Sequence, residues 1–293
     1  MFVFKAAVVG AGTMGGEIAQ VVAAAGIPVV LKDIEQRFVD QGLAKAREVT
    51  EGRLRSLVAK GKLSEEDARR QAEETLGLIE GTTSYDAFGD VDFVIEAVPE
   101  RMDLKRRVFA ELDACTPGHA ILASNTSSLS ITEMGEATSR PHQVCGFHFF
   151  YPASVMRLIE IVAGEDTAPE TLQAASNFAL AIRKTPIRCE EVPGFVVNRV
   201  LLSALSELWR ATEEDGLSFE QVDRAVQESR AAPMGPYFLT DLLGLDTVLH
   251  VAEHLYEQYG PERFHVLGKL RELVAAGHLG QKTGKGFYEH GSA

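Results

Sequence analysis

Two polar residues of this sequence could form a proton-transfer pair. His148 follows the apolar run Val144–Phe147, and Glu160 lies within the next apolar run, Leu158–Val162. If these runs are neighbouring antiparallel strands, the two side chains can face one another. A neutral imidazole can take a proton from a hydroxyl group, and a carboxylate can fix which ring nitrogen carries the hydrogen. His148 and Glu160 are therefore candidate catalytic residues, although either one alone could be a structural side chain.

Two further polar segments could hold a substrate. Residues 124–128 read Ser-Asn-Thr-Ser-Ser and follow the apolar run that begins at Ile121. In doubly wound sheets, ligands bind beyond the carboxyl ends of the strands, where this segment is expected. Asn198 lies one or two turns into a helical pattern that begins after Pro193-Gly194. Because Ser, Thr and Asn also cap helices and turns, a structural role stays open for each segment.

A glycine-rich segment has the spacing of a dinucleotide-binding loop. Gly10-Ala11-Gly12-Thr13-Met14-Gly15 directly follows the strand-like run Ala6–Val9 and begins a helical pattern. The first glycine would make a tight turn, the second would let the backbone approach a pyrophosphate, and the third would let helix and strand pack closely. The N-terminus of the helix would then face the phosphates with unpaired N–H groups.

An acidic residue completes this pattern. Asp33 follows the run Pro28–Lys32, which reads as the second strand of a βαβ unit. At that position a carboxylate can accept hydrogen bonds from the adenosine ribose and repel a 2′-phosphate. The sequence therefore predicts NAD as the cofactor, and Arg37 nearby leaves NADP as an alternative.

The elements that must position these residues change character along the chain. Short β-branched runs alternate with helical patterns as far as about Cys189, which is typical of a parallel sheet with crossover helices. We expect strands at 6–9, 29–32, 93–97, 121–124, 144–147 and 158–162, and helices at 13–25, 35–60, 64–76, 101–115 and 169–182. Beyond Pro193-Gly194 only helical patterns follow, at 195–214, 219–228, 237–259 and 261–276. The predicted fold is an α/β, Rossmann-type, mostly parallel sheet domain (1–189) followed by an all-helical domain (190–293).

Composition narrows the classes of partner. The 293-residue chain has a net charge of −13 and three widely spaced cysteines. A charge of this sign disfavours nucleic acid, the apolar segments are too short or too interrupted to span a membrane, and the cysteine pattern favours a reducing, cytoplasmic location. One stretch is basic: eight basic and five acidic side chains lie between Leu43 and Arg70. This stretch could bind a small polyanion or could be a solvated helical face.

Taken together, these segments resemble one family, the short-chain 3-hydroxyacyl-CoA dehydrogenases, which include bacterial 3-hydroxybutyryl-CoA dehydrogenases. The resemblance covers nearly the whole chain. It is carried by the glycine segment at 10–15, Ile95-Glu96-Ala97-Val98-Pro99-Glu100, Ser124-Asn125-Thr126-Ser127-Ser128, His148-Phe149-Phe150, Pro193-Gly194-Phe195 through Arg199, Pro233-Met234-Gly235-Pro236, Lys282-Thr283-Gly284 and Gly286-Phe287-Tyr288.

The resemblance implies specific roles. His148 would be the catalytic base, oriented by Glu160, and Ser127 and Asn198 would hold the substrate. Further cofactor contacts would come from Asp33, Glu100, Lys105 and Lys282, in addition to Gly10, Gly12, Thr13, Met14 and Gly15. Lys60 and Lys62 are candidates for binding coenzyme A, and the helical domain would pair two subunits. Where the family commonly reads His-Phe-Phe-Asn-Pro, this chain has Tyr151 before Pro152, so the contact of that asparagine is not carried over.

The predicted reaction is the reversible, NAD-dependent oxidation of a 3-hydroxyacyl-CoA, with a short chain such as 3-hydroxybutyryl-CoA. One alternative is a dehydrogenase of the same superfamily that acts on a sugar acid or a free hydroxy acid. Another is an NAD-binding protein without catalytic activity, against which the presence of both His148 and Glu160 counts. The segment His250-Val251-Ala252-Glu253-His254 spells an inverted zinc-peptidase motif, but so short a pattern recurs by chance, and no metal is predicted.

Overall fold

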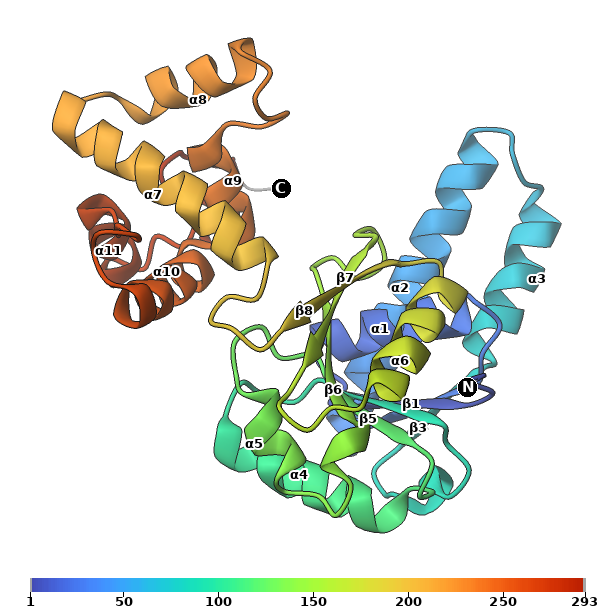
Figure 1. Ribbon diagram of the computed structural model, residues 1–293. Helices are drawn as coiled ribbons and strands as arrows, with labels where there is room; N and C mark the ends of the chain where they lie inside the picture. The colour runs from blue at the N-terminus through green and yellow to red at the C-terminus, as the bar shows by residue number, and fades with distance from the viewer. Residues whose placement is uncertain (1, 292–293) are drawn as a thin grey trace. The chain divides into compact units, whose positions relative to one another are not determined.

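The computed structural model describes residues 2–291, which fall into two compact units that divide between Glu191 and Val192 (Figure 1). In the described residues of the first unit, eight strands form one sheet in the order β3-β2-β1-β4-β5-β6-β7-β8. All neighbours are parallel except β6 and β7, which are antiparallel. The strands are β1 Ala6–Val9, β2 Val29–Lys32, β3 Ile79–Thr82, β4 Phe93–Glu96, β5 Ile121–Ser124, β6 Val144–Phe149, β7 Leu158–Ala163 and β8 Thr185–Glu190.

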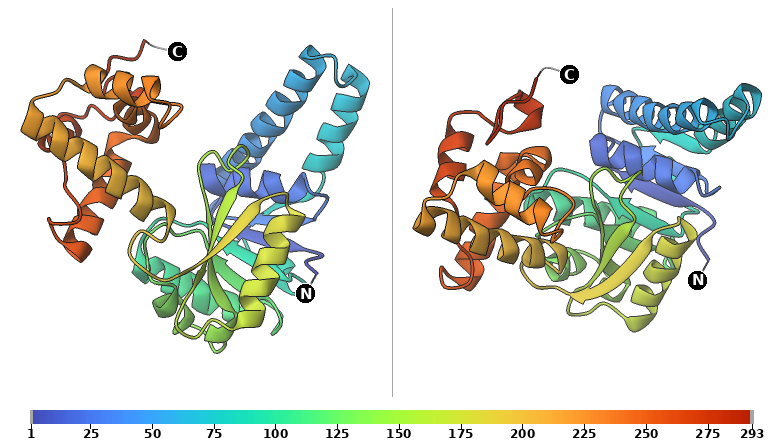
Figure 2. Two further views of the ribbon diagram at one scale, coloured as in Figure 1. Left: turned by 45° about the horizontal axis from the view of Figure 1, so that its top comes forward. Right: turned by 90° about the horizontal axis from the view of Figure 1, so that it is seen from above.

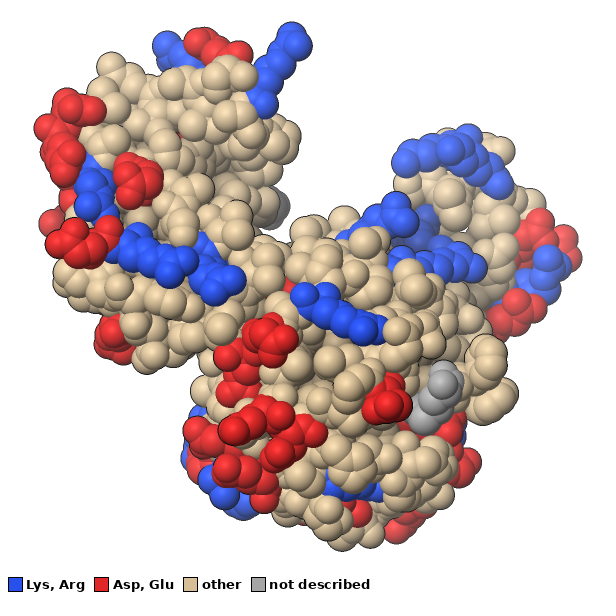
Figure 3. All heavy atoms as spheres, viewed as in Figure 1, with Lys and Arg blue, Asp and Glu red and all other residues tan. Residues whose placement is uncertain are grey.

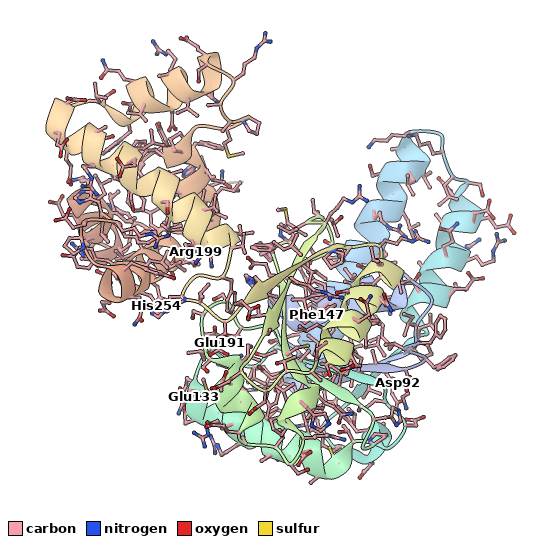
Figure 4. The ribbon with its side chains drawn as sticks, viewed as in Figure 1. Asp92, Glu133, Phe147, Glu191, Arg199 and His254 are labelled. Carbon is pink, nitrogen blue, oxygen red and sulfur yellow. The ribbon has the colours of Figure 1, made fainter. Side chains whose placement is uncertain are left out.

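Helices cover both faces of this sheet, which explains why its central strands are continuous apolar runs (Figures 1 and 2). Helices α1 and α6 lie on one face, where Phe93, Phe147 and Phe178 pack ring against ring. Helices α4 and α5 lie on the other face. Figure 4 shows Phe147 among the strands of this unit. The bounds are α1 Thr13–Ala23, α4 Met102–Cys115, α5 Ile131–Gly135 and α6 Pro169–Ala181, with short 3₁₀ turns at Asp86–Phe88 and Pro141–Gln143.

Helices α2 (Gln36–Ala59) and α3 (Glu65–Leu76) form a hairpin that extends away from the sheet (Figures 1 and 2). The Ser64 hydroxyl caps α3 by accepting a hydrogen bond from the Asp67 N–H. The buried residues of α2 end at Leu54, and α3 has none among its described residues. Figure 3 shows Lys and Arg side chains over α2 and the outer end of the hairpin.

Glu191, labelled in Figure 4, fixes the last residues of the first unit. Its carboxylate accepts hydrogen bonds from the Ser130 hydroxyl and from the backbone N–H (2.7 Å) and hydroxyl (2.9 Å) of Thr132. These donors surround the N-terminus of α5, where an anion is favoured because the first N–H groups of a helix have no partner within it.

The second unit is helical in its described part, apart from isolated bridges near Lys285. Trp209 and Tyr237 are its largest fully buried side chains. The confirmed fold class is therefore an α/β sheet domain followed by a helical domain. The helices are α7 Val197–Asp215, α8 Phe219–Glu228, α9 Pro236–Leu243, α10 Leu245–Tyr259 and α11 Gly268–Ala275, with a 3₁₀ turn at Gln281–Thr283.

Two buried carboxylates, Asp223 of α8 and Asp241 of α9, fix the segment around Gly286. Asp241 accepts hydrogen bonds from the N–H groups of Phe287 (2.8 Å) and Tyr288 (2.9 Å), and its Oδ2 lies 2.7 Å from His290 Nε2. Asp223 accepts from the N–H groups of Tyr237 (2.8 Å) and Phe238 (3.0 Å) and from the Tyr288 hydroxyl (2.8 Å). The segment around Gly286 is thus fixed by charge-assisted hydrogen bonds.

Several expected elements were wrong in detail. Strands β3 and β8 were missed because both contain polar residues and neither has a buried position, so neither shows an apolar run. Strand β6 extends to Phe149, which places His148 within it. The helix expected at 237–259 is two helices, because Gly244 turns the chain with a φ of +93°. The helix expected from residue 261 begins only at Gly268. The preceding segment is not helical, although its side chains Phe264, Val266 and Leu267 are buried.

Candidate active site

The glycine loop between β1 and α1 has the shape of a dinucleotide site. A Cβ atom on Gly15 would lie 1.7 Å from the carbonyl oxygen of Gly10, so only glycine allows this contact of helix and loop. A Cβ on Gly12 would meet nothing within 4 Å, so the space above the loop is open. Helix α1 begins at Thr13, followed by Met14, and a pocket of about 400 Å³ adjoins Ala11, Gly12 and Thr13. A pyrophosphate would fit against the backbone N–H groups at the N-terminus of α1.

Asp33 lies beside this loop at the end of β2. Its Oδ2 accepts a hydrogen bond of 2.7 Å from the Ala11 N–H, and its Oδ1 accepts one of 2.6 Å from the Ile34 N–H. The carboxylate therefore ties β2 to the glycine loop. Each oxygen still has lone-pair capacity for a ribose hydroxyl, because a carboxylate can accept about four hydrogen bonds.

The loops after β4 and β5 are joined by a buried polar network. Lys105 Nζ lies 2.8 and 2.9 Å from the two carboxylate oxygens of Glu96 and 3.2 Å from Glu100 Oε2. Glu96 also accepts hydrogen bonds of 2.6 Å from the Ser124 hydroxyl and from the Val98 N–H. Glu96 and Lys105 are 0% and 1% exposed. A buried ion pair of this kind is retained only where its remaining lone pairs are satisfied, as they are here.

Glu100 connects this network to Ser127. Its Oε1 accepts hydrogen bonds from the Thr126 hydroxyl and, at 3.1 Å, from the Ser127 N–H. Burial would raise the pKa of the Glu100 carboxyl, but the Lys105 ammonium and these hydrogen bonds lower it. The net pKa lies below the ordinary value of 4.5. Glu100 is thus an ionised carboxylate that orients the backbone carrying Ser127.

His148 and Glu160 face each other across the antiparallel pair of β6 and β7, where they are directly opposed in register. The distance from His148 Nδ1 to Glu160 Oε2 is 2.7 Å, and both side chains are buried. Because a carboxylate accepts, Nδ1 carries the hydrogen and Nε2 is the basic nitrogen of the neutral ring. The Asn125 side-chain oxygen accepts a hydrogen bond of 2.8 Å from the Phe149 N–H and so joins the loop after β5 to this strand.

Two buried charged residues, Lys184 and Glu17, fix the loop that follows β6. Lys184 Nζ donates to the carbonyl oxygens of Ala153 and, at 2.7 Å, of Met156. Glu17 accepts hydrogen bonds of 3.2 and 3.3 Å from the N–H and hydroxyl of Ser154. Burial lowers the pKa of Lys184 from its ordinary value. Tyr151, at the start of this loop, is 58% exposed.

Two of the expected site residues belong to the second unit. Asn198 is the second residue of α7. Lys282 lies in the 3₁₀ turn Gln281–Thr283, where its Nζ forms an ion pair with Asp246 at distances of 2.6 and 2.7 Å. Burial would raise the pKa of Asp246, but its hydrogen bond and charge interaction with Lys282 lower the net value.

Comparisons with known proteins agree along the whole chain. The family model "3-hydroxyacyl-CoA dehydrogenase, NAD binding domain" matches residues 5–192, and the model of the C-terminal domain of the same family matches residues 194–290. The chain belongs to the 3-hydroxyacyl-CoA dehydrogenase family. It therefore carries an NAD-binding domain, and NAD fits the glycine loop and Asp33 described above.

Individual members of the family are similar over nearly their full length. A probable 3-hydroxybutyryl-CoA dehydrogenase of Deinococcus radiodurans is 40% identical, over 98% of this chain and 100% of its own. A 3-hydroxybutyryl-CoA dehydrogenase of Clostridioides difficile is 39% identical, over 98% and 99%. The crystal structure of (S)-3-hydroxybutyryl-CoA dehydrogenase from Ralstonia eutropha has a TM-score of 0.89 and 38% identity, and the match covers 99% of this chain and 100% of that one.

The basic hairpin presents a pocket that the sequence did not reveal. It has a volume of about 860 Å³ and lies between α2 and α3. Lys60 and Lys62 are at the turn of the hairpin and do not line this pocket. Its charged lining residues are three arginines and three glutamates, and Glu51 forms ion pairs with Arg47 (3.7 Å) and Arg55 (3.5 Å). The apolar part of the lining includes Leu54 and Leu76.

Two further residues of the candidate site were given no role from the sequence. Glu96 stands at the end of a strand that is otherwise apolar, and a charge in such a run was the available signal. Asn125 was noted only as part of a polar segment. Among residues 2–291, no group of three or more His, Cys, Asp and Glu side chains is arranged to hold a metal ion. No helix within that range is both long and apolar enough to cross a membrane.

Proposed function

We propose that this protein is an NAD-dependent dehydrogenase that oxidises the 3-hydroxyl group of a short-chain 3-hydroxyacyl-CoA, reversibly, to the 3-ketoacyl-CoA. The observation that carries the proposal is the buried pair of His148 and Glu160 at 2.7 Å. Asn125, in the loop after β5 and beyond the carboxyl ends of the parallel strands, accepts a hydrogen bond from the N–H of Phe149, the residue after His148. The relatives named as 3-hydroxybutyryl-CoA dehydrogenases supply the substrate class.

In this proposal His148 accepts the proton of the 3-hydroxyl group at Nε2. Glu160 keeps hydrogen on Nδ1, holds the ring orientation, and stabilises the imidazolium that forms. Ser127 and Asn198 bind the hydroxyl and the thioester carbonyl, and this positioning contributes up to roughly 7–11 kcal/mol toward the barrier at best. NAD, when bound, supplies the hydride acceptor.

We assign cofactor binding to the segments after β1, β2 and β4 and to Lys282. The loop from Gly10 to Gly15 holds the pyrophosphate, and Asp33 binds the adenosine ribose, which favours NAD over NADP. Glu100 and Lys282 provide further contacts. The ammonium of Lys105 is enclosed by Glu96 and Glu100, so its contribution to cofactor binding runs through Glu100.

Coenzyme A recognition is assigned to the hairpin of α2 and α3. Its pocket combines arginines, which suit phosphates, with apolar side chains, which suit an adenine ring. Glu51, Glu65 and Glu73 also line it, so a phosphate must bind where an arginine is not neutralised by a glutamate. Two variants separate the possible anchors. Neutralising Arg55 and Arg69 tests the pocket, and neutralising Lys60 and Lys62 tests the turn. Neutralising the pair that binds coenzyme A should raise KM for the CoA thioester several-fold at low salt, and this increase should be smaller at high salt. The same variant should leave KM for a pantetheine thioester unchanged.

We further propose a cytoplasmic homodimer that associates through the helical unit. Supporting the dimer, α9 exposes Phe238, Leu242 and Leu243, and α10 exposes Tyr256. Supporting the location, the chain has only three cysteines. Replacing Leu242 and Leu243 with serine should lower the molar mass in sedimentation equilibrium if this surface is the interface, and an unchanged mass would contradict it.

The function is tested by measuring NADH formation with three substrates side by side: 3-hydroxybutyryl-CoA, free 3-hydroxybutyrate and a sugar acid. We expect turnover with the thioester and far lower kcat/KM with the two free acids. Preference for a free acid would favour the alternative dehydrogenase. Binding of NAD without turnover of any of the three would favour a catalytically silent NAD-binding protein.

A further inference from the structure

The buried network after β4 carries unequal numbers of opposite charges. Glu96 and Glu100 contribute two carboxylates, and within the described residues the ion pairs of both run to the same cation, Lys105. One negative charge is therefore left over. It resides on the Glu100 side, because Glu96 is fully enclosed, whereas the Glu100 side chain is 34% exposed. An uncompensated charge in such a half-buried setting acts on a neighbouring ligand more strongly than it would in water.

The strand order indicates which half of the cofactor meets this charge. β1 lies between β2 and β4, and β4 is followed by β5. The glycine loop after β1 fits the pyrophosphate, and Asp33 after β2 fits the adenosine ribose. The rest of the dinucleotide must then extend in the opposite direction, over the loops that follow β4 and β5. Those loops carry Glu100 and Ser127, which are joined by a hydrogen bond of 3.1 Å.

The nicotinamide ring changes charge during the reaction. It carries a formal positive charge in NAD⁺ and none in NADH, whereas the rest of the dinucleotide is the same in both. A fixed negative charge beside the ring therefore distinguishes the two forms, while a contact with the ribose or pyrophosphate does not. Charge near the reacting ring is one of the means by which a protein tunes a cofactor.

We propose that Glu96 and Lys105 are positioning residues that hold an ionised Glu100 at the nicotinamide end of the site, so that their surplus negative charge favours NAD⁺ over NADH. This inference rests on the proposed function and deepens it. Glu96 fixes Lys105 from within the sheet, and Lys105 in turn fixes Glu100. The consequence for turnover is that oxidation of the hydroxyl converts a tightly held cofactor form into one that leaves more readily.

The test is the ratio of two dissociation constants, that of NAD⁺ divided by that of NADH, measured on the purified full-length protein. NADH binding is followed by fluorescence and NAD⁺ binding by competition. Glu96→Gln removes the surplus charge and should raise the ratio roughly three- to tenfold. The double variant Glu96→Gln with Lys105→Met removes one charge of each sign, restores the surplus, and should return the ratio toward that of the unaltered protein.

A matched control separates this local effect from a change in net charge. Asp103→Asn removes an exposed carboxylate from α4, the helix that carries Lys105. Asp103 pairs there with Arg101. Solvent and salt screen that position, so the ratio should stay within a factor of about two. If Glu96→Gln changes the affinities for both cofactor forms by the same factor, the network is merely structural and the proposal is wrong.

A second variant keeps the test decisive if Glu96→Gln does not fold. Glu100→Gln removes the same charge from a partly exposed position and should raise the ratio by a similar factor; an unchanged ratio would overturn the proposal. Failure of the proposed function gives a different result. In that case the unaltered protein would bind both cofactor forms with the expected dependence on Glu96 but would not oxidise the CoA thioester.

Discussion

The two units bury carboxylates equally well but use them differently. In the helical unit, Asp223 and Asp241 accept hydrogen bonds mainly from backbone N–H groups of α9 and of the C-terminal segment. In the sheet unit, Glu96 and Glu160 accept mainly from side chains that can themselves change charge or move a proton, Lys105 and His148. All four are less than one-tenth exposed. Burial alone therefore does not distinguish the carboxylates proposed to act in the site from those that fix the backbone, whereas their main donors differ.

The difference follows from where each carboxylate stands. Glu96 ends β4, and Glu160 lies opposite His148 on β7, so both are part of the sheet that carries the cofactor loops. Asp241 lies within α9 and accepts hydrogen bonds from Phe287 and Tyr288, whose N–H groups are not paired within a named strand or helix. A buried N–H without a partner costs free energy, and Asp241 removes that cost for two of them.

The comparison predicts the largest change in activity at His148. His148→Ala removes the proposed base and should lower kcat by about 10²–10⁴-fold, because positioned acid–base groups contribute that much. NAD affinity and the melting temperature should change little. The control His142→Ala, at an exposed position in the turn Pro141–Gln143, should keep full activity. Near-normal turnover of His148→Ala would show that the proton is transferred by another group.

The largest change in stability is predicted at Asp241. Asp241→Asn keeps the size but loses the charge that three donors share, and the amide N–H₂ opposes one of those donors. The free energy of unfolding measured in urea should fall by about 2–3 kcal/mol. Activity per folded molecule should remain within a few-fold of normal. Asp215→Asn, exposed at the end of α7, is the matched control and should change neither quantity.

A smaller change in activity is predicted at Glu160, which acts through His148. Glu160→Gln retains an acceptor for the Nδ1 hydrogen but loses the charge that stabilises the imidazolium, so kcat should fall by about tenfold or more. KM for NAD should be nearly unchanged, since Glu160 lies on β7 and has no part in the glycine loop. An unaltered kcat together with a lower melting temperature would assign Glu160 to the structural class that Asp241 represents.

The smallest effect is predicted for the pH dependence of stability at Glu100. Its folded-state pKa is lowered below the ordinary 4.5, so ionised Glu100 stabilises the fold fully above that value. The contribution is lost as pH falls through the lowered pKa. The melting temperature of Glu100→Gln should thus lie about 1–3 °C below that of the unaltered protein from pH 7 to about 5, and the two should converge in stronger acid. A gap that persists below the lowered pKa would contradict this assignment.

The sequence revealed what depends on local patterns. β1, β2 and β5 were predicted with their correct bounds because they are apolar runs bounded by loops. The glycine loop and Asp33 follow a short-range motif, and the opposition of His148 and Glu160 follows from one antiparallel pairing. Edge strand β8 was not visible, because it lies exposed at the edge of the sheet and includes Pro186 and Arg188.

What the sequence did not reveal depends on contacts between distant positions. The Ser124 hydroxyl reaches Glu96 from the next strand, and Lys105 reaches it from the intervening helix. Neither the distances between these side chains nor the balance of their charges can be predicted before the order of the strands is known. The contacts of Lys184 with the loop after His148 belong to the same class, since they join β8's N-terminal flank to a loop about thirty residues earlier.

The outer part of the α2–α3 hairpin has a consequence for the motions of the protein. Beyond Leu54, the described residues of α2 and all of α3 lack buried side chains, so little apolar contact opposes their opening. In heavy water their amides should exchange earlier than those of α1, which is buried along most of its length. A ligand that occupies the pocket between the two helices can bind only the closed hairpin, so it should slow this exchange by the factor by which it shifts the opening equilibrium.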